Sequence, residues 1–205
     1  MYLQDMFAGG IETSSTTMEW LMAELLQHPR VMKKAQEETR RVVGKKAKVD
    51  MNDVNQMDYL KNVVKEAMRL HPPIALLVPR ETTARVQLGG YDIPAKTRVL
   101  INAWAIHRDP DFWERPEEFN PERFENNPID FNSQDFKFIP LGFGRRRCPG
   151  LAFGSANIEY LIANLLYWFD WKLPNDAENM DMTEAYGLSV FKKFPIHVIP
   201  VSYSP

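Results

Sequence analysis

The only cysteine of the chain, Cys148, lies in a loop whose composition favours a reactive sulfur. Residues 141–150 read LGFGRRRCPG, so three arginines stand directly before the sulfur and an apolar helical segment follows it. Guanidinium charges and the free N–H groups at a helix start both favour the thiolate anion. The glycines let the backbone approach a flat or bulky group closely. The loop therefore predicts a thiolate ligand, and haem iron is one known partner of such a ligand.

An acid and an alcohol, Glu12 and Thr13, form a second group with chemical potential. They follow Gly9 and Gly10, and each glycine costs a helix about 1 kcal/mol relative to alanine. A helix tolerates such residues where it bends or where a ligand approaches it. Two interpretations stay open here: a site beside a ligand, or a loosely packed helix start with a Thr or Ser cap.

Three charged residues further along the chain have both an ordinary and a functional interpretation. Glu66 and Arg69 stand three residues apart on one helix face, where an exposed pair would contribute only about 0.2–0.5 kcal/mol. Arg80 follows the prolines that end that helix, and the planar fork of arginine suits a carboxylate partner. The alternative for Arg80 is a surface arginine paired with a nearby acid.

The cysteine loop resembles the haem-binding loop of the cytochrome P-450 family, whose pattern is F-x-x-G-x-R-x-C-x-G. Gly144, Arg146, Cys148 and Gly150 match this pattern, while Leu141 stands where the family usually has phenylalanine. The leucine still gives the sulfur apolar cover. The resemblance implies that Cys148 is the metal ligand of haem b and that the other four residues belong to the cofactor-binding loop, with Arg146 on a haem propionate.

The helix start resembles the oxygen-activation motif of the same family, G-x-[D/E]-T. By that resemblance Thr13 would hydrogen-bond dioxygen and Glu12 would be the acid that helps to deliver protons. A kink at Gly9 and Gly10 would open a groove for oxygen. Arg80 matches the family's second propionate contact.

A structural network is also implied by the resemblance. Residues 121–124 read PERF, and in the family the arginine of this segment joins a buried E-x-x-R pair. Glu66, Arg69 and Arg123 are therefore expected to be structural and not catalytic, because partial loss of a buried ionic network is costly.

Other residues carry weaker signals. Residues 74–78 and 187–190 resemble substrate-facing segments of the family, with plain core packing as the alternative for both. His107 is interpreted as a structural histidine at a strand-to-helix junction, and Trp104 and Phe112 as core residues.

Composition limits the possible classes of protein. The 205 residues are 44% hydrophobic and 25% charged with a formal net charge of -2, which gives no support to a nucleic-acid partner. One cysteine excludes an internal disulfide framework and a multi-cysteine zinc site. No apolar run approaches the roughly 20 residues of a membrane span, and the start lacks a basic signal-peptide region. Taken alone, the chain is expected to be soluble.

The hydrophobic spacing predicts a mainly α fold with small β-sheets, and the resemblance makes it the C-terminal half of a single cytochrome P-450 domain over residues 1–205. The expected elements are helices over 1–28, 30–43, 58–70 and 150–169, a hairpin of 86–88 with 91–93, a strand over 97–102, a turn capped by Asn52 or Asp53, a short helix capped by Asp109-Pro110, a long ordered segment over 115–147, and β signals at 188–191 and 196–201.

The resemblance implies a haem-thiolate monooxygenase that inserts one oxygen atom of O2 into a small apolar substrate, of the kind found in plant secondary metabolism. Electrons would come from NADPH through a reductase partner. The full-length protein would sit on the cytosolic face of the endoplasmic reticulum membrane through an N-terminal anchor. That anchor and the distal half of the haem pocket are expected to be absent from this chain, which would then bind haem poorly alone.

Two other functions are alternatives to a monooxygenase. The first is a truncated, non-catalytic remnant of such an enzyme. The second is a cysteine-nucleophile hydrolase, which needs a histidine base beside Cys148. The four histidines are scattered and none stands in a recognisable nucleophile context: His28, His71, His107 and His197.

Overall fold

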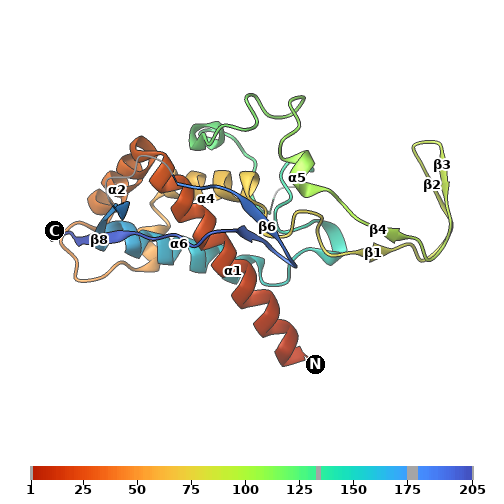
Figure 1. Cartoon of the computed structure of the whole chain (residues 1–205), viewed down its shortest axis with the longest axis horizontal. Helices are drawn as coiled ribbons and strands as arrows, with labels where there is room; N and C mark the ends of the chain where they lie inside the picture. The colour runs from red at the N-terminus through yellow and green to blue at the C-terminus, as the bar shows by residue number, and fades with distance from the viewer. Residues whose placement is uncertain (1, 133–134, 175–179, 205) are drawn as a thin grey trace.

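Four long helices form the body of the molecule. The computed structural model describes residues 2–132, 135–174 and 180–204. The long helices are α1 (Tyr2–Gln27), α2 (Pro29–Val43), α4 (Asp58–Leu70) and α6 (Leu151–Trp168). Helix α1 crosses the body obliquely, and its N-terminal half extends beyond the other elements (Figure 1). All four helices lie where the hydrophobic spacing predicts them.

Local sequence signals explain where these helices begin and end. Pro29 occupies the first turn of α2, where its fixed φ suits a helix and its missing N–H is not needed. The same helix ends at Gly44, which has a φ of 62° and donates its N–H to the carbonyl of Arg40. Helix α4 ends at His71, directly before two prolines.

The helices pack around one large apolar core. The buried apolar side chains of α4 include those that the spacing predicts, and they meet buried residues of α1, α2 and α6. They include Leu60, Val63, Val64 and Ala67 from α4 and Ile158, Ile162 and Leu166 from α6. A smaller cluster of Leu77, Ala103 and Ile139 lies apart from the large core.

The strands form small antiparallel pairs. The pairs are β1 (Arg80–Glu81) with β4 (Arg98–Val99), β2 (Val86–Leu88) with β3 (Tyr91–Ile93), β5 (Phe169–Lys172) with β8 (Ile199–Ser202), and β6 (Glu184–Tyr186) with β7 (Val190–Lys192). The hairpin β2–β3 turns at Gly89 and Gly90, whose φ values of 59° and 82° fit a primed two-residue turn. This hairpin projects far from the helical body (Figure 1).

Short elements differ from the expectations in detail. Helix α3 (Met51–Val54) is capped by Asp50, while Asp53 accepts the N–H of Asp50 in return, so the cap predicted at Asn52 or Asp53 lies two or three residues too late and Asp53 is its reciprocal partner. The predicted strand over 97–102 is ordered as a strand only over Arg98–Val99.

The short helix predicted to start at Asp109-Pro110 is wrong. The helix there, α5 (Ala103–Ile106), comes earlier and is capped by the Asn102 side chain, which accepts the N–H of Ala105. Asp109 instead accepts the N–H of Asp111 in a turn. The long segment over 115–147 is ordered, apart from residues outside the described ranges, and contains two short 3-10 helices, η1 (Pro121–Phe124) and η2 (Gly144–Arg146).

Two predicted core residues are wrong. Trp104 is 38% exposed and Phe112 is 50% exposed. Both rings lie beside a cationic side chain: the guanidinium of Arg108 is 4.3 Å from the Trp104 ring centre, and Lys137 Nζ is 5.6 Å from that of Phe112. Cation–π contact gives an aromatic ring a partner without full burial. Among the described helices, none is long and apolar enough to cross a bilayer.

Candidate functional site

Two glycines let the backbone of the cysteine loop turn sharply. Gly142 and Gly144 have φ values of 75° and 69°, a left-handed conformation that residues with a side chain rarely adopt. The turn closes where Cys148 donates its N–H to the carbonyl of Leu141 at 2.9 Å, and Arg147 donates to Gly144 at 3.1 Å. These bonds place the cysteine at the end of a rigid loop.

The sulfur lies at the start of helix α6. Cys148 is a free, half-buried thiol that packs against the large core. Gly150 is the N-cap of α6, and a Cβ added there would stand 3.9 Å from the sulfur. The amide groups of the first helical turn and the positive end of the helix dipole therefore lie close to the cysteine, an arrangement that suits an anion.

The arginines of this region are available for a ligand. Arg145, Arg146 and Arg147 are exposed, and none of their side chains has a hydrogen bond or ion pair among the residues that the structure describes. Arg80 donates from Nη2 to the carbonyl of Phe143 at 3.2 Å, which ties strand β1 to the cysteine loop. The alternative for Arg80, a pairing with a nearby acid, does not occur within the described ranges.

Apolar side chains surround the loop without being covered. The segment 74–78 is bonded to residues 101–104, since the amides of Ile101 and Trp104 bond to the carbonyls of Leu76 and Ala75. Phe143 of the loop packs against the small cluster that contains Leu77. The side chains of Leu76, Val78 and Phe153 are exposed. This surface combines apolar cover, free cations and one thiol.

Glu12 and Thr13 lie on helix α1, apart from the cysteine loop. The hydroxyl of Thr13 donates to the carbonyl of Gly9 at 2.5 Å. The helix continues without interruption through Gly9 and Gly10, and within the described ranges no atom lies within 4 Å of a Cβ placed on either glycine. The kink expected there is not seen as a break in the helix, but the space beside both glycines is open.

Glu12 is exposed and borders a hollow of about 740 Å³ between α1, Trp171 and the segment that contains Pro195. No interaction in the described part of the chain joins Glu12 or Thr13 to Cys148. The structure therefore places the two predicted halves of the site on separate elements and does not bring them into contact.

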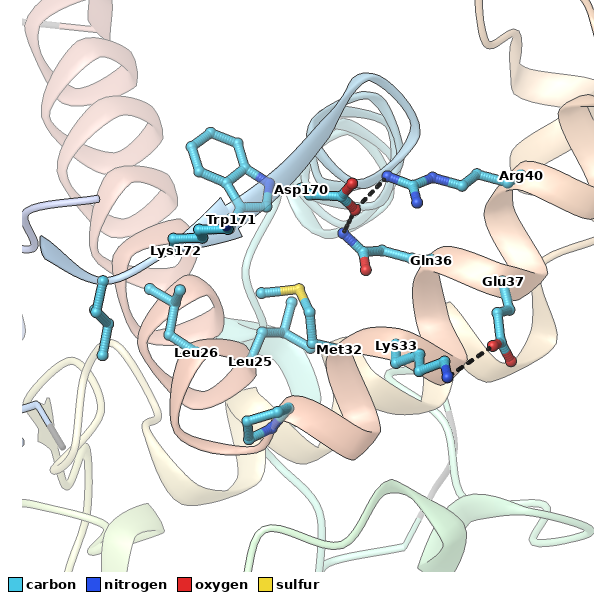
Figure 2. Close-up of a pocket in the computed structure, with 12 residues that line it drawn as sticks. Leu25, Leu26, Met32, Lys33, Gln36, Glu37, Arg40, Asp170, Trp171 and Lys172 are labelled. Atoms are coloured by element: carbon cyan, nitrogen blue, oxygen red, sulfur yellow. Dashed lines mark hydrogen bonds and ion pairs between the residues drawn. The ribbon is translucent and has the colours of Figure 1, made fainter. Parts of the chain in front are cut away.

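A larger groove, of about 800 Å³, lies elsewhere and contains none of the predicted site residues (Figure 2). Its floor is apolar, with Leu25 and Met32 from the end of α1 and from α2. On one wall Arg40 Nη2 lies 2.9 Å from Asp170 Oδ1, and Gln36 Nε2 donates to the same carboxylate oxygen at 3.3 Å. This groove lies between α2 and strand β5, and no residue of the cysteine loop lines it.

The predicted ionic network is confirmed. Glu66 and Arg69 are fully buried, with Arg69 Nε and Nη2 bonded to the two oxygens of Glu66 at 2.8 and 2.9 Å. Arg123 Nε donates to the same carboxylate at 2.9 Å, as does the amide of Asn120 at 2.8 Å. Arg69 also donates to the carbonyl of His107 at 2.6 Å. The network fastens α4 to η1 and to the loop after α5.

His107 is structural, as predicted. Its Nε2 accepts the amide N–H of Ile139 at 2.9 Å, so its Nδ1 carries the proton that is donated to the carbonyl of Arg69. Burial, with a smaller contribution from the Arg69 charge, lowers the pKa of His107 to about 3. This ring stays neutral and holds the start of the cysteine loop against α4.

A buried cluster around His71 was missed from the sequence. His71 lies between Glu24 of α1 and Glu184 of β6, and the ring of Trp20 stacks on it. One local signal existed, because Glu24 and His28 stand four residues apart on one helix. The contacts from His71 to Glu24 and Glu184 join distant segments, which spacing alone does not reveal.

The histidines do not support a cysteine hydrolase. His28 and His71 bond to Glu24, and His107 is enclosed as described. His197 is exposed. Across the described residues no histidine contacts Cys148, so the thiol has no general base.

The chain is similar in sequence and in structure to proteins of one known family. The sequence pattern of the cytochrome P-450 family matches residues 1–198. A phenylacetaldehyde oxime monooxygenase of Prunus mume is 59% identical over 99% of this chain and 39% of the relative. Cytochrome P-450 71A1 of Persea americana is 60% identical over 95% of this chain and 39% of that protein.

A solved zebrafish cytochrome P-450 with abiraterone has a TM-score of 0.85 and 33% identity, and the match covers 97% of this chain and 46% of that chain. This chain thus spans about two fifths of the length of the curated relatives it matches. The sequence match, the structural match and the arrangement of the cysteine loop agree: the chain belongs to the cytochrome P-450 family and adopts part of its fold.

Proposed function

We propose that Cys148 is the thiolate ligand of a haem iron in a monooxygenase. The observation that carries this proposal is the glycine-folded loop that presents one free thiol at the start of α6. The surrounding groups fit the cofactor, since Arg80 and Arg146 have spare donors for carboxylates and Leu141 is half-buried near the sulfur. One thiolate suits an iron whose other in-plane ligands come from a porphyrin.

When bound, the haem would supply an iron that activates dioxygen, with electron density from the thiolate favouring O–O cleavage. The chain's own residues would bind and orient this group and manage protons. Cys148 would hold the iron, and Arg80 and Arg146 would hold the two propionates. The exposed carboxylate of Glu12 can exchange protons with water, and the Thr13 hydroxyl can pass them on after leaving the Gly9 carbonyl.

The proposed reaction is R–H + O2 + NADPH + H⁺ → R–OH + H2O + NADP⁺. We propose a small apolar substrate from plant secondary metabolism. The exposed apolar side chains of Leu76, Val78 and Leu188 support an apolar ligand. The names of plant relatives, an oxime monooxygenase and a desmethylyatein synthase of Sinopodophyllum hexandrum that is 54% identical, support the substrate class.

The partner and the location follow from the family. We propose an NADPH-dependent reductase as the electron donor and the cytosolic face of the endoplasmic reticulum membrane as the site of the full-length protein. Both rest on membership of the family.

The test uses a chimera in which this chain replaces the segment that it matches in the Prunus mume relative. The purified chimera, a plant NADPH-dependent reductase and phenylacetaldehyde oxime are incubated under ¹⁸O2. The proposal predicts NADPH oxidation coupled to the insertion of one ¹⁸O atom into the organic product at each turnover, with the second atom released as water. Turnover without label in the product, or without a requirement for NADPH, would contradict it. The unmodified relative serves as the positive control.

For the isolated 205-residue chain, a non-catalytic state is the second candidate. The observation that favours it is the N-terminal half of α1, where Leu3, Met6, Phe7 and Ile11 are exposed on a helix that extends from the body (Figure 1). A haem bound against this surface would be exposed to water, and a protein retains haem better where apolar side chains cover it.

A further inference from the structure

The side chain of His71 joins three elements through two carboxylates, the buried Glu24 and the part-buried Glu184. Its Nε2 lies 2.6 Å from Glu24 Oε1 of α1, and its Nδ1 lies 3.7 Å from Glu184 Oε1 of β6. His71 itself follows directly after α4. In the described structure Nδ1 is buried without a hydrogen-bond partner, so the Glu184 carboxylate is its nearest counter-charge.

The two ring nitrogens of His71 each face a carboxylate. Burial alone would raise the pKa of Glu24, but hydrogen bonds from His28 and His71 outweigh it and lower that pKa to about 2. Contact with His71 also lowers the pKa of Glu184. Both acids are therefore anions around the ring.

The same cluster grips the turn of the β6–β7 hairpin. The Trp20 ring lies parallel to His71 with 4.0 Å between the ring centres, and its Nε1 donates to the carbonyl of Val190 at 2.8 Å. On the other side the amide of Val190 donates to the carbonyl of Pro73 at 2.9 Å. Val190 is thus held between α1 and the segment that follows His71.

Other charged groups face the cluster from each element. His28 is bonded to Glu24, and Lys192 of β7 lies over the Trp20 ring at 5.4 Å and donates to the carbonyl of Asp181. Tyr186 donates to Glu184 at 2.9 Å. Arg108 and Glu19 contribute longer-range charge to Glu184 and Lys192 respectively. None of these groups replaces the bridge from α1 to β6 that His71 makes.

We propose that His71, placed between Glu24 and Glu184, is a positioning residue that fixes the turn 187–190 relative to helix α1 and so shapes the substrate side of the cavity. This rests on the proposed function, because that turn faces substrate only if the chain forms a haem monooxygenase. The bridge itself is a property of the chain alone. The two parts are therefore tested separately.

Amide hydrogen exchange of Val190 tests the bridge in the 205-residue chain without haem. In Glu184→Gln, the carboxylate charge is lost while a side chain of the same size remains. Exchange at Val190 should rise about three- to fivefold, since an ion pair to a part-buried carboxylate contributes up to about that factor. In His71→Phe, which keeps a ring for Trp20 to stack on, exchange should rise as much or more.

His28→Gln is the matched control. It removes the other imidazole from the same Glu24 carboxylate but leaves the hairpin contacts intact. Exchange at Val190 should stay within about twofold of the parent chain. Exchange at Val63 and Val64 of α4 reports whether each variant is folded. Unchanged protection of Val190 in folded Glu184→Gln overturns the proposal, and so does an equal loss of protection in His28→Gln.

Ligand affinity in the chimera gives a second readout that a purely packing role would not produce. In the chimera, Glu184→Gln should keep the haem band and change the ratio of octylamine to butylamine affinity by several-fold. An unchanged ratio of octylamine to butylamine affinity would overturn the claim that His71 shapes the cavity. Absence of the haem band from the chimera would instead count against the proposed function.

Discussion

At the scale of single residues, the chemistry of a side chain is set by the backbone that surrounds it. His107 accepts one amide N–H and donates to one carbonyl, so protonation would leave the Ile139 amide facing a second donor. The surroundings of Cys148 have the opposite effect, because glycines and the start of a helix leave its sulfur partly accessible to a ligand. One ring is enclosed as neutral, and one thiol is presented to a ligand.

The lowered pKa of His107 predicts a loss of stability in acid. The folded pKa is about 3 and the ordinary value is 6.5, so the unfolded chain binds the extra proton between these values. Stability from this group is complete above pH 6.5 and is lost as the pH falls towards 3, with a limiting slope of about 1.4 kcal/mol per pH unit.

Chemical unfolding of the chain and of His107→Gln at pH 7.5, 6.0 and 5.0 checks this prediction. The variant should be less stable at pH 7.5, and the difference should shrink as the pH falls, because glutamine binds no proton. Glu24 does not interfere, since its contribution changes only below its ordinary value of 4.5. Parallel stability curves for the two proteins would contradict the assignment.

At the scale of elements, buried ionic and capping contacts fasten short segments to the long helices. The network of Glu66, Arg69 and Arg123 joins α4 to η1, with Glu66 and Arg69 fully buried. Asp50 performs a smaller task at the start of α3, where it accepts the amides of Asn52 and Asp53. The two kinds of contact differ in burial and therefore in their expected effects.

Removal of one partner from the buried network should be strongly destabilising. Glu66→Ala leaves two guanidinium groups without their carboxylate, and we expect a loss of about 3–5 kcal/mol in the free energy of unfolding. Glu118→Ala removes the exposed partner of Arg115 and should cost at most about 1 kcal/mol. Denaturant titration measures both. A similar small effect for the two variants would show that the network is not a structural lock.

The cap of α3 gives a smaller, separate prediction. Asp50→Ala should lower the free energy of unfolding by about 0.5–2 kcal/mol, because two amides lose their acceptor. Asp50→Asn keeps an acceptor oxygen and should lose less. If Asp50→Asn were the more damaging change in a thermal melt, the charge and not the cap would be the stabilising feature.

Sequence patterns predicted the elements that depend on local periodicity and missed those that depend on distant partners. The spacing in α4 and the Gly89-Gly90 turn were sufficient to place a helix and a hairpin. Trp104 and Phe112 were wrongly placed in the core, because cation–π contacts with Arg108 and Lys137 give both rings a partner while the rings stay exposed.

The prediction of site residues had the same limit, because contacts between segments that are distant in sequence could not be predicted from spacing. The role of Glu66 came from the family resemblance, since an E-x-x-R pair alone has an equally good exposed interpretation. The bridge from Glu24 through His71 to Glu184 was not anticipated, because its three residues lie in segments far apart in sequence. The contact between Arg80 and the cysteine loop likewise appears only in three dimensions.

At the scale of the whole molecule, the body is well packed but one helix is not covered. The apolar side chains on the N-terminal half of α1 face solvent, as do Val78 and Phe153 near the cysteine loop. An apolar surface of this kind is costly in water and favours association. Figure 1 shows this part of α1 standing clear of the other elements.

The isolated chain should therefore bind haem weakly and self-associate. Titration with haem followed by gel filtration should strip most of the pigment, while the chimera should keep it. Ile11→Asn on the exposed face of α1 should reduce association in light scattering, and Leu60→Asn in the core should instead unfold the chain. Stoichiometric retention of haem by a monomeric 205-residue chain would contradict this expectation.

The most direct test of the central claim is the absorption spectrum of the chimera after reduction and treatment with carbon monoxide. With Cys148 intact we predict the strongly red-shifted band of thiolate-bound haem, and Ser155→Ala on α6 should keep it. Cys148→Ser should abolish that band even where pigment is retained. A red-shifted band of full intensity in Cys148→Ser would show that this sulfur is not the ligand.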